Sequence, residues 1–289
     1  MWHAIAATIA AATGNPFTVE RRTAVTGGCI NRAFRIEGGG AAYFVKVNAA
    51  NAGEMFAAEA AALEEISRGA TVRVPRVVCH GASPTQSWLV TEYIALSPTG
   101  DFRMLGRRLA AMHRVTSRSF GWWRDNTIGA TPQVNSPAAR WPDFWREQRL
   151  GFQLRRAAER GYGGGLQRKG EKLLARLDLI LAHHAPPASL LHGDLWSGNM
   201  AFDAEGMPVI FDPATYYGDR EADLALTELF GRLPQAFYSA YREAYPVEAG
   251  YALRKDLYNL YHVLNHLNLF GAGYLRQAES LMVRLLDRA

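Results

Sequence analysis

The chain has 289 residues, of which 48% are hydrophobic and 20% charged, a composition typical of a globular protein that can bury a core. Its formal charge is +5, but the 32 basic residues are mixed with 27 acidic ones, so nucleic-acid binding is not expected. Two cysteines make no disulfide framework, and no apolar run approaches the length of a membrane span. We therefore expect a cytoplasmic protein without membrane contact.

The first third of the chain has the pattern of a helix followed by a small antiparallel sheet. The apolar first thirteen residues lack the positive start of a secretory signal and predict a helix that ends near Gly14. Residues 54–66 show helical spacing, with Asn51 and Glu54 as a capping box. A hairpin turn is expected at 37–40 and a second turn at 81–84. β-rich runs predict strands at 33–36, 43–47, 72–78 and 88–93.

The rest of the chain is mainly helical in pattern. Helices are expected at 101–115, 143–159 and 170–184, and from 221 to the end with breaks at Pro234, Pro246 and 271–273. Short strand-like runs lie at 189–191, 200–202 and 208–211. A β-rich front and a helical rear predict an α+β, two-lobed architecture, divided into residues 1–95 and 96–289.

Three polar side chains have the spacing of kinase-type phosphoryl transfer. Residues 191–199 are Leu-His-Gly-Asp-Leu-Trp-Ser-Gly-Asn, and Phe-Asp-Pro follows at 211–213. Asp194 can accept the proton of an attacking hydroxyl, while Asn199 and Asp212 can hold Mg²⁺ ions that bridge phosphates. A single loop Asp is more often a cap or turn residue, but three such residues beside short strands favour phosphoryl transfer.

A lysine in an expected strand extends this pattern. Lys46 lies between two valines, where an ammonium needs anionic partners unless the strand is an edge with Lys46 in solvent. Kinase folds pair such a lysine with a helix glutamate so that the lysine meets the nucleotide phosphates. We assign Glu59, thirteen residues on, as the partner. Glu54 and Glu64 are the competing candidates.

The segment 192–199 resembles the catalytic loop of the fructosamine kinase (ketosamine-3-kinase) family, with Trp196-Ser197 as the narrower signal. This family is related to aminoglycoside phosphotransferases and choline kinases and has a protein-kinase-like fold. Runs at 26–31, 132–135 and 264–271 extend the resemblance over nearly the whole chain. It implies an ATP- and Mg²⁺-dependent kinase acting on the 3-hydroxyl of free or protein-bound ketosamines, which leads to deglycation.

The resemblance also implies further binding residues. Gly27 and Gly28 would bring bare backbone to the phosphates, although a Gly-Gly pair is also a common turn. Glu92 and Ile94 correspond to the hinge that bonds adenine, although the position also fits a plain strand end. His266 is as consistent with a core histidine as with a substrate contact. The candidates for substrate contact are Trp196, His266 and Asn135.

Several alternatives remain open at this point. Another acceptor, such as an aminoglycoside or choline, would use the same acidic residues, and a catalytically silent kinase-like protein would keep the fold. Asp212-Pro213-Ala214 departs from the Asp-Phe-Gly of protein kinases, and no P-loop motif is present, which fits a small-molecule kinase. Cys29, beside the glycines, is either inert or redox-sensitive. The sequence does not distinguish a monomer from a homodimer.

Overall fold

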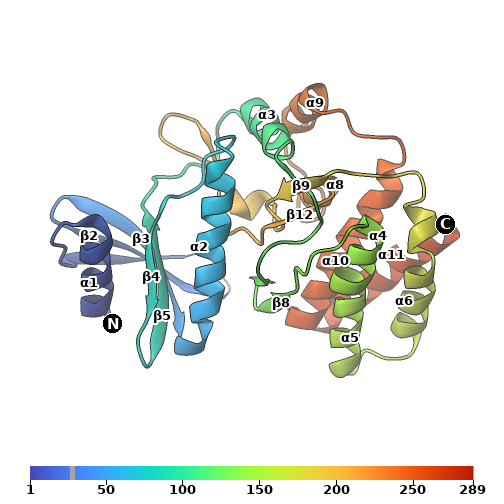
Figure 1. Ribbon diagram of the computed structural model, residues 1–289, viewed down its shortest axis with the longest axis horizontal. Helices are drawn as coiled ribbons and strands as arrows, with labels where there is room; N and C mark the ends of the chain where they lie inside the picture. The colour runs from blue at the N-terminus through green and yellow to red at the C-terminus, as the bar shows by residue number, and fades with distance from the viewer. Residues whose placement is uncertain (27–29, 289) are drawn as a thin grey trace. The chain divides into compact units, whose positions relative to one another are not determined.

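The computed structural model describes residues 1–26 and 30–288 and divides into two units (Figure 1). The first unit comprises Met1–Asp101 and Asn199–Pro213, and the second comprises Phe102–Gly198 and Ala214–Ala289. The first unit thus extends six residues past the expected boundary after residue 95. It also takes in a later segment that sequence analysis assigned to the second lobe.

The first unit is built on an antiparallel sheet in the order β1-β2-β3-β5-β4. Its elements are α1 (Trp2–Thr13), β1 (Arg21–Val25), β2 (Arg32–Gly38), β3 (Ala41–Ala49), α2 (Gly53–Arg68), β4 (Val77–Ala82), β5 (Gln86–Glu92), β10 (Met200–Phe202) and β11 (Pro208–Ile210). Short 3₁₀ turns at Ala50–Ala52 and Ser197–Asn199 precede α2 and β10.

The helices α1 and α2 lie on opposite faces of this sheet (Figure 1). Ile5 and Ile9 of α1 pack in one cluster with Val45 and Val47 of β3. On the other face, Phe56 of α2 packs in a cluster that includes β5. Because successive strand residues point to opposite faces, residue 46 of β3 is directed to the side of α2.

Several expectations for this unit are confirmed, and two are wrong. The first helix ends at Gly14, which has a φ of +71°, and Gly39 and Gly40 form the hairpin turn with positive φ. The capping box is wrong, because α2 begins at Gly53 without a side-chain cap. The strand at 72–78 is also misplaced: the chain becomes a strand only at Val77, after Pro75, whose nitrogen has no proton to donate.

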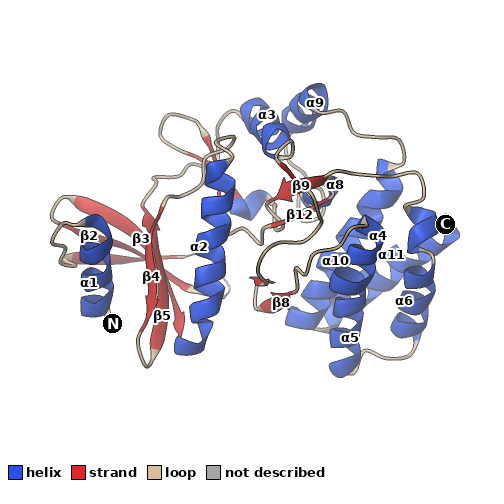
Figure 2. Ribbon diagram, in the orientation of Figure 1, coloured by secondary structure: helices blue, strands red, loops and turns tan. Residues whose placement is uncertain are grey.

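The second unit is mostly helical (Figure 2). Its elements are α3 (Phe102–Met112), β6 (Thr116–Ser117), β7 (Asn126–Ile128), β8 (Thr131–Gln133), α4 (Trp141–Phe144), a π-helical turn (Trp145–Leu150), α5 (Gly151–Glu159), α6 (Gly165–Ala175), α7 (Leu177–Ile180), β9 (Ala188–Leu191), β12 (Tyr216–Gly218), α8 (Glu221–Leu226), α9 (Gln235–Ala244), α10 (Tyr251–Phe270), a 3₁₀ turn (Ala272–Tyr274) and α11 (Leu275–Asp287).

Helix α10 runs through the core of this unit and packs against α8, α5 and α11. A separate helix pair, α3 and α9, approaches closely at Gly106, where a Cβ atom would lie 2.4 Å from the carbonyl oxygen of Phe237. The expected helices are present. The β7–β8 hairpin, the strands β6 and β12 and the π-helical turn were not foreseen, because each is too short to leave a periodic pattern. Within the described ranges, none of the helices combines the length and apolar character needed to cross a bilayer.

A buried charge cluster lies at the start of α8. The ring of His184 bonds Asp219 through Nε2 (2.6 Å) and Glu248 through Nδ1 (2.9 Å), so both ring nitrogens donate and the imidazole is protonated. Arg254 donates to both oxygens of Glu221, at 2.6 and 2.9 Å. Burial acts to lower the pKa of His184, but the hydrogen bond and charge of Asp219 outweigh it and hold the pKa above 6.5.

This cluster makes the stability of the fold dependent on pH. The pKa of His184 is raised, so its contribution is complete below pH 6.5 and is lost as the pH rises through the folded-state pKa. The pKa of Asp219 is held below 3.8, chiefly by His184 against the effect of burial, so its contribution is present above pH 3.8 and lost on acidification. Urea unfolding across pH should therefore show a fall in unfolding free energy above neutral pH. His184→Gln should lose that alkaline slope; an unchanged slope would contradict the assignment.

Candidate active site

Three charged side chains of the first unit meet at one point. The Nζ atom of Lys46 lies 2.5 Å from Oε1 of Glu59 and 2.6 Å from Oδ1 of Asp212. β3 supplies the lysine, α2 the glutamate, and the end of the β10–β11 hairpin the aspartate. The structure thus makes the ion pair expected from the sequence and rejects the edge-strand alternative, because Lys46 is only 8% exposed.

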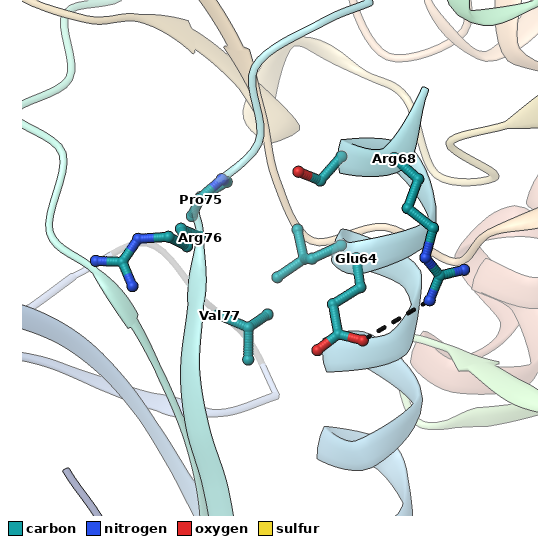
Figure 3. Close-up of a pocket in the computed structure, with 7 residues that line it drawn as sticks. Glu64, Arg68, Pro75, Arg76 and Val77 are labelled. Atoms are coloured by element: carbon teal, nitrogen blue, oxygen red, sulfur yellow. Dashed lines mark ion pairs between the residues drawn. The ribbon is translucent and has the colours of Figure 1, made fainter. Parts of the chain in front are cut away.

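The competing partner Glu64 lies elsewhere. It approaches Arg68 (4.0 Å) beside a surface hollow of about 340 Å³ between α2 and the segment that leads into β4 (Figure 3). This hollow is lined by Leu63, Glu64, Ser67, Arg68, Pro75, Arg76 and Val77. None of the residues assigned to binding lines it, so it is separate from the candidate site.

The triad of Lys46, Glu59 and Asp212 has one cation for two carboxylates. Burial acts to lower the pKa of Lys46, but Asp212 and Glu59 outweigh it and raise the pKa above the ordinary value. Burial, together with the charge of Asp212, raises the pKa of Glu59 despite the nearby ammonium. When both carboxylates are ionised, the triad therefore carries a net negative charge, which suits the addition of a further cation.

The side chain of Asp212 is the exposed member of the triad. It is 45% exposed, against 10% for Lys46 and 13% for Glu59. Its φ of +60° is unusual for a residue other than glycine, and such conformations are typical of functional positions. Oxygen atoms of Asp212 are thus accessible to a ligand while one of them is held by Lys46.

The β10–β11 hairpin brings Asn199 next to this segment. Met200 pairs with Ile210, and the backbone N–H of Phe211 donates to the carbonyl of Asn199 (3.0 Å). The two residues expected to bind metal, Asn199 and Asp212, therefore flank the same end of one hairpin. Asp203 closes its other end by accepting backbone N–H groups of Glu205 and Met207, at 3.1 and 2.8 Å.

Asp194 belongs to the second unit, in a loop that follows β9. β9 pairs with β12, and the buried carboxylate of Asp223 in α8 accepts the backbone N–H groups of His192 (2.7 Å) and Gly193 (2.8 Å). The ring Nδ1 of His192 accepts the N–H of Asp194 itself (3.2 Å). Asp223 and His192 thus hold the backbone that leads into Asp194.

Asp223 is itself held in the ionised state. Burial would raise its pKa, but the hydrogen bond from His113 Nε2 (3.2 Å) and the bonds to His192 outweigh burial and lower it. Tyr241 completes the arrangement by bonding Nδ1 of His113 (2.7 Å). The ring of His113 thus links Asp223 to Tyr241.

Asp223→Asn should therefore destabilise the fold and slow turnover. The introduced amide has one oxygen for two backbone donors, and its NH₂ group must face another N–H, which costs about 1–3 kcal/mol for each unsatisfied group. We expect an unfolding free energy lower by about 2–4 kcal/mol in urea titrations. A loss below about 0.5 kcal/mol would show that the loop does not depend on this carboxylate.

Two segments are expected to bind the nucleotide. Gly27 and Gly28, with the adjoining Cys29, lie outside the described residues. Glu92 ends β5 opposite Tyr43, and its backbone N–H donates to the carbonyl of Arg76 (2.9 Å). Ile94 follows beyond the strand, half-buried.

The three candidates for substrate contact differ in accessibility. Trp196 is 37% exposed and its ring covers the Cα of Gly198, while His266 is half-buried among the rings of Phe230, Phe270 and Tyr274. Nδ1 of His266 bonds the carbonyl of His262 (2.8 Å).

Asn135 is not placed for substrate contact. It is fully buried, and its side chain donates to Asn126 Oδ1 (3.0 Å) and accepts from Arg149 (2.7 Å). The family resemblance pointed to the segment around Asn135 but carried no information on its burial. We therefore correct the assignment: Asn135 is an internal residue.

Proteins similar in sequence to this chain are named as kinases. A family model described as fructosamine kinase matches residues 1–288. A protein of Synechocystis sp. named as a ketoamine kinase is 47% identical over 288 residues and covers 99% of this chain and 97% of its own. A protein of Arabidopsis thaliana named as a protein-ribulosamine 3-kinase is 41% identical and covers 93% of this chain and 83% of its own.

Solved structures show the same architecture. The crystal structure of a protein from Haemophilus somnus, described as a fructosamine-3-kinase, has a TM-score of 0.91 at 29% identity and covers 99% of this chain and 98% of its own. An aminoglycoside phosphotransferase, solved with AMP-PNP and hygromycin B, has a TM-score of 0.64 at 15% identity over 98% of both chains, a likeness of fold alone. The expected α+β, protein-kinase-like fold is confirmed. With its family model matched over nearly every residue, the chain belongs to the fructosamine kinase family.

Proposed function

We propose that this protein is an ATP- and Mg²⁺-dependent kinase that phosphorylates the 3-hydroxyl of ketosamines. Membership of the fructosamine kinase family and relatives named as ketoamine and ribulosamine kinases support the reaction class. The structural observation that best supports the proposal is the triad of Lys46, Glu59 and Asp212, in which one ammonium lies between two carboxylates.

The donor set of the first unit fits a magnesium ion. Asp212 offers an exposed carboxylate, Asn199 adds an amide at the same end of the hairpin, and the triad sets two carboxylates against one ammonium. Mg²⁺ prefers a few such oxygen ligands and completes its shell with phosphate oxygens and water. Bound there, the ion would neutralise charge that develops on the transferred phosphoryl group.

Side chains of the protein bind the phosphates and accept the proton of the attacking hydroxyl. Lys46, fixed by Glu59, holds its ammonium ready for the phosphates of ATP. The family resemblance assigns Gly27 and Gly28 to the same phosphates. Asp194 orients the attacking hydroxyl and accepts its proton. Because the backbone N–H groups of His192, Gly193 and Asp194 are held by internal hydrogen bonds, little reorganisation is needed during the reaction.

Recognition of the ketosamine involves the two accessible aromatic side chains. Trp196 lies two positions after Asp194 and has the exposed ring surface on which a sugar can stack. With Nδ1 of His266 donating to a backbone carbonyl, Nε2 is left as an acceptor suited to a hydroxyl or a protonated amine. Glu92 and Ile94 would contribute backbone groups to the adenine.

Turnover with defined acceptors tests the proposal. Purified protein is given ATP and Mg²⁺ with fructosyl-lysine, ribulosyl-lysine, an aminoglycoside or choline, and ADP release is followed together with the product by mass spectrometry. We expect phosphorylation of one or more ketosamines. Turnover of only the aminoglycoside or choline would overturn the substrate class, and the absence of any ATP-dependent product would overturn the kinase activity.

A further inference from the structure

Two backbone carbonyls next to the catalytic loop are held by buried side-chain amides. Nε2 of Gln133 donates to the carbonyl oxygen of Ala214 (3.0 Å), and Nδ2 of Asn126 donates to that of Thr215 (2.7 Å). Both amides come from the β7–β8 hairpin, whose register places them directly opposite each other. The carbonyls belong to the segment that leads into β12.

Each of these amides is fixed in orientation by further bonds. Nε2 of Gln133 also donates to Oδ1 of Asn126 (2.8 Å), and Oε1 of Gln133 accepts the hydroxyl of Tyr261 in α10 (2.8 Å). Burial raises the pKa of Tyr261 to about 12, so the hydroxyl keeps the proton that it donates. Asn135 donates to the same oxygen of Asn126 (3.0 Å). An amide flip would place like groups against each other, so the two NH₂ groups stay directed at the carbonyls.

A buried cation anchors this amide network. Arg149, in the π-helical turn, is fully buried and donates to Oδ1 of Asn135 (2.7 Å) and to the carbonyl of Val134 (2.7 Å). Its guanidinium lies over the rings of Tyr216 (4.0 Å) and Phe144 (4.5 Å). π-Helical turns are rare and occur often at functional sites, and this one directs Arg149 inward.

The carbonyl held by Gln133 presses against the catalytic loop. The N–H of Ala214 donates to the carbonyl of His192 (2.8 Å). Gly193 has a φ of +82°, and a Cβ atom on it would lie only 2.0 Å from the carbonyl oxygen of Ala214. The oxygen that accepts the amide of Gln133 therefore lies against the residue immediately before Asp194.

We propose that Gln133 and Asn126 are positioning residues for the reaction: by holding the carbonyls of Ala214 and Thr215, they fix the backbone that carries Asp194. This inference rests on the proposed function, in which Asp194 accepts the proton of the substrate. The two amides are buried and are not among the residues assigned to substrate or nucleotide. Their effect passes through the backbone, and a displacement of about 1 Å at a reacting group is enough to cost about 100-fold in rate.

Substitution of Gln133 tests the donor directly. Gln133→Met keeps much of the volume and removes the donor to Ala214, so we expect kcat to fall about 10- to 100-fold while KM for ATP changes less than about twofold. Hydrogen exchange of the backbone at 192–195 and 214–216 should rise about tenfold or more in the same variant. Unchanged exchange would overturn the proposal whatever the activity. If the wild-type protein has no kinase activity but exchange still rises in Gln133→Met, the proposed function is overturned while the positioning of the loop stands.

Gln133→Glu provides a signature that a general loss of stability does not produce. The introduced carboxylate repels the carbonyl of Ala214 at high pH, but burial raises its pKa, and the protonated acid can donate as the amide does. Between about pH 9 and pH 6, kcat of this variant relative to wild type should therefore rise about tenfold. A ratio that stays flat with pH in a folded variant would contradict the role of the donor.

A tyrosine pair supplies a gentler variant and its control. Tyr261→Phe removes only the hydroxyl that fixes Gln133 and should lower kcat about tenfold. Tyr238→Phe removes an equally buried hydroxyl, which bonds the carbonyl of Thr227 (3.1 Å) and the N–H of Leu233 (3.2 Å) away from the loop. We expect similar losses of thermal stability in both but normal kcat in Tyr238→Phe. Equal kcat in the two variants would overturn the proposal.

Discussion

Replacing Asp194 with Asn should lower kcat for ketosamine phosphorylation by about 10²–10⁴-fold while ATP still binds. The substitution keeps the size and shape of the side chain but removes its ability to accept a proton. The backbone of the loop is held by Asp223 and His192, so it should keep its conformation. Lys46 and Asp212, assigned to the nucleotide and metal, belong to the first unit and are unchanged.

The measurement pairs turnover with nucleotide binding. Steady-state kinetics with the best ketosamine give kcat, and a thermal shift with ATP and Mg²⁺ reports binding separately. Asp178→Asn, which removes an exposed carboxylate from α7 of the same unit, is the matched control and should keep kcat within about twofold. Near-normal turnover of Asp194→Asn would remove the proton acceptor from the mechanism.

The parts of the site that could be predicted are those in which local pattern and chemistry coincide. A lysine within a strand core needs a carboxylate, and a helix thirteen residues later supplies Glu59 at the correct turn. Asp194, Asn199 and Asp212 lie within a short stretch of sequence, and the strands around them leave apolar runs. Such features are visible in the chain before it folds.

The parts that could not be predicted depend on contacts between distant segments. Tyr261 and Gln133 are 128 positions apart, and no spacing rule connects them. The membership of residues 199–213 in the first unit likewise depends on tertiary contacts, such as the bonds between Ser97 and Phe202 at 2.8 and 2.9 Å. Asn135 was assigned to substrate through the family resemblance, which carries no information on burial, and the bond from the buried Arg149 makes an interior position favourable.

Replacing Lys46 with Met should destabilise the protein by about 3–5 kcal/mol and abolish most phosphoryl transfer. The ammonium of Lys46 is the cation that pairs with Glu59, and its removal leaves a buried carboxylate beside Asp212. Without the ammonium, the folded-state pKa of Glu59 rises further above its unfolded value. The destabilisation should therefore be complete at high pH and disappear as the pH falls below the unfolded pKa of the carboxyl, near 4.5.

A second substitution separates stability from catalysis. Lys46→Met with Glu59→Leu replaces the buried pair by apolar side chains, and such replacements are often neutral or stabilising. Asp212 remains, but its exposed carboxylate is solvated and needs no buried partner. We expect urea unfolding to show most of the lost free energy restored in the double variant, while kcat stays at least about 100-fold below wild type. If the double variant recovered turnover with stability, Lys46 would be a structural residue of the fold and would not contact ATP.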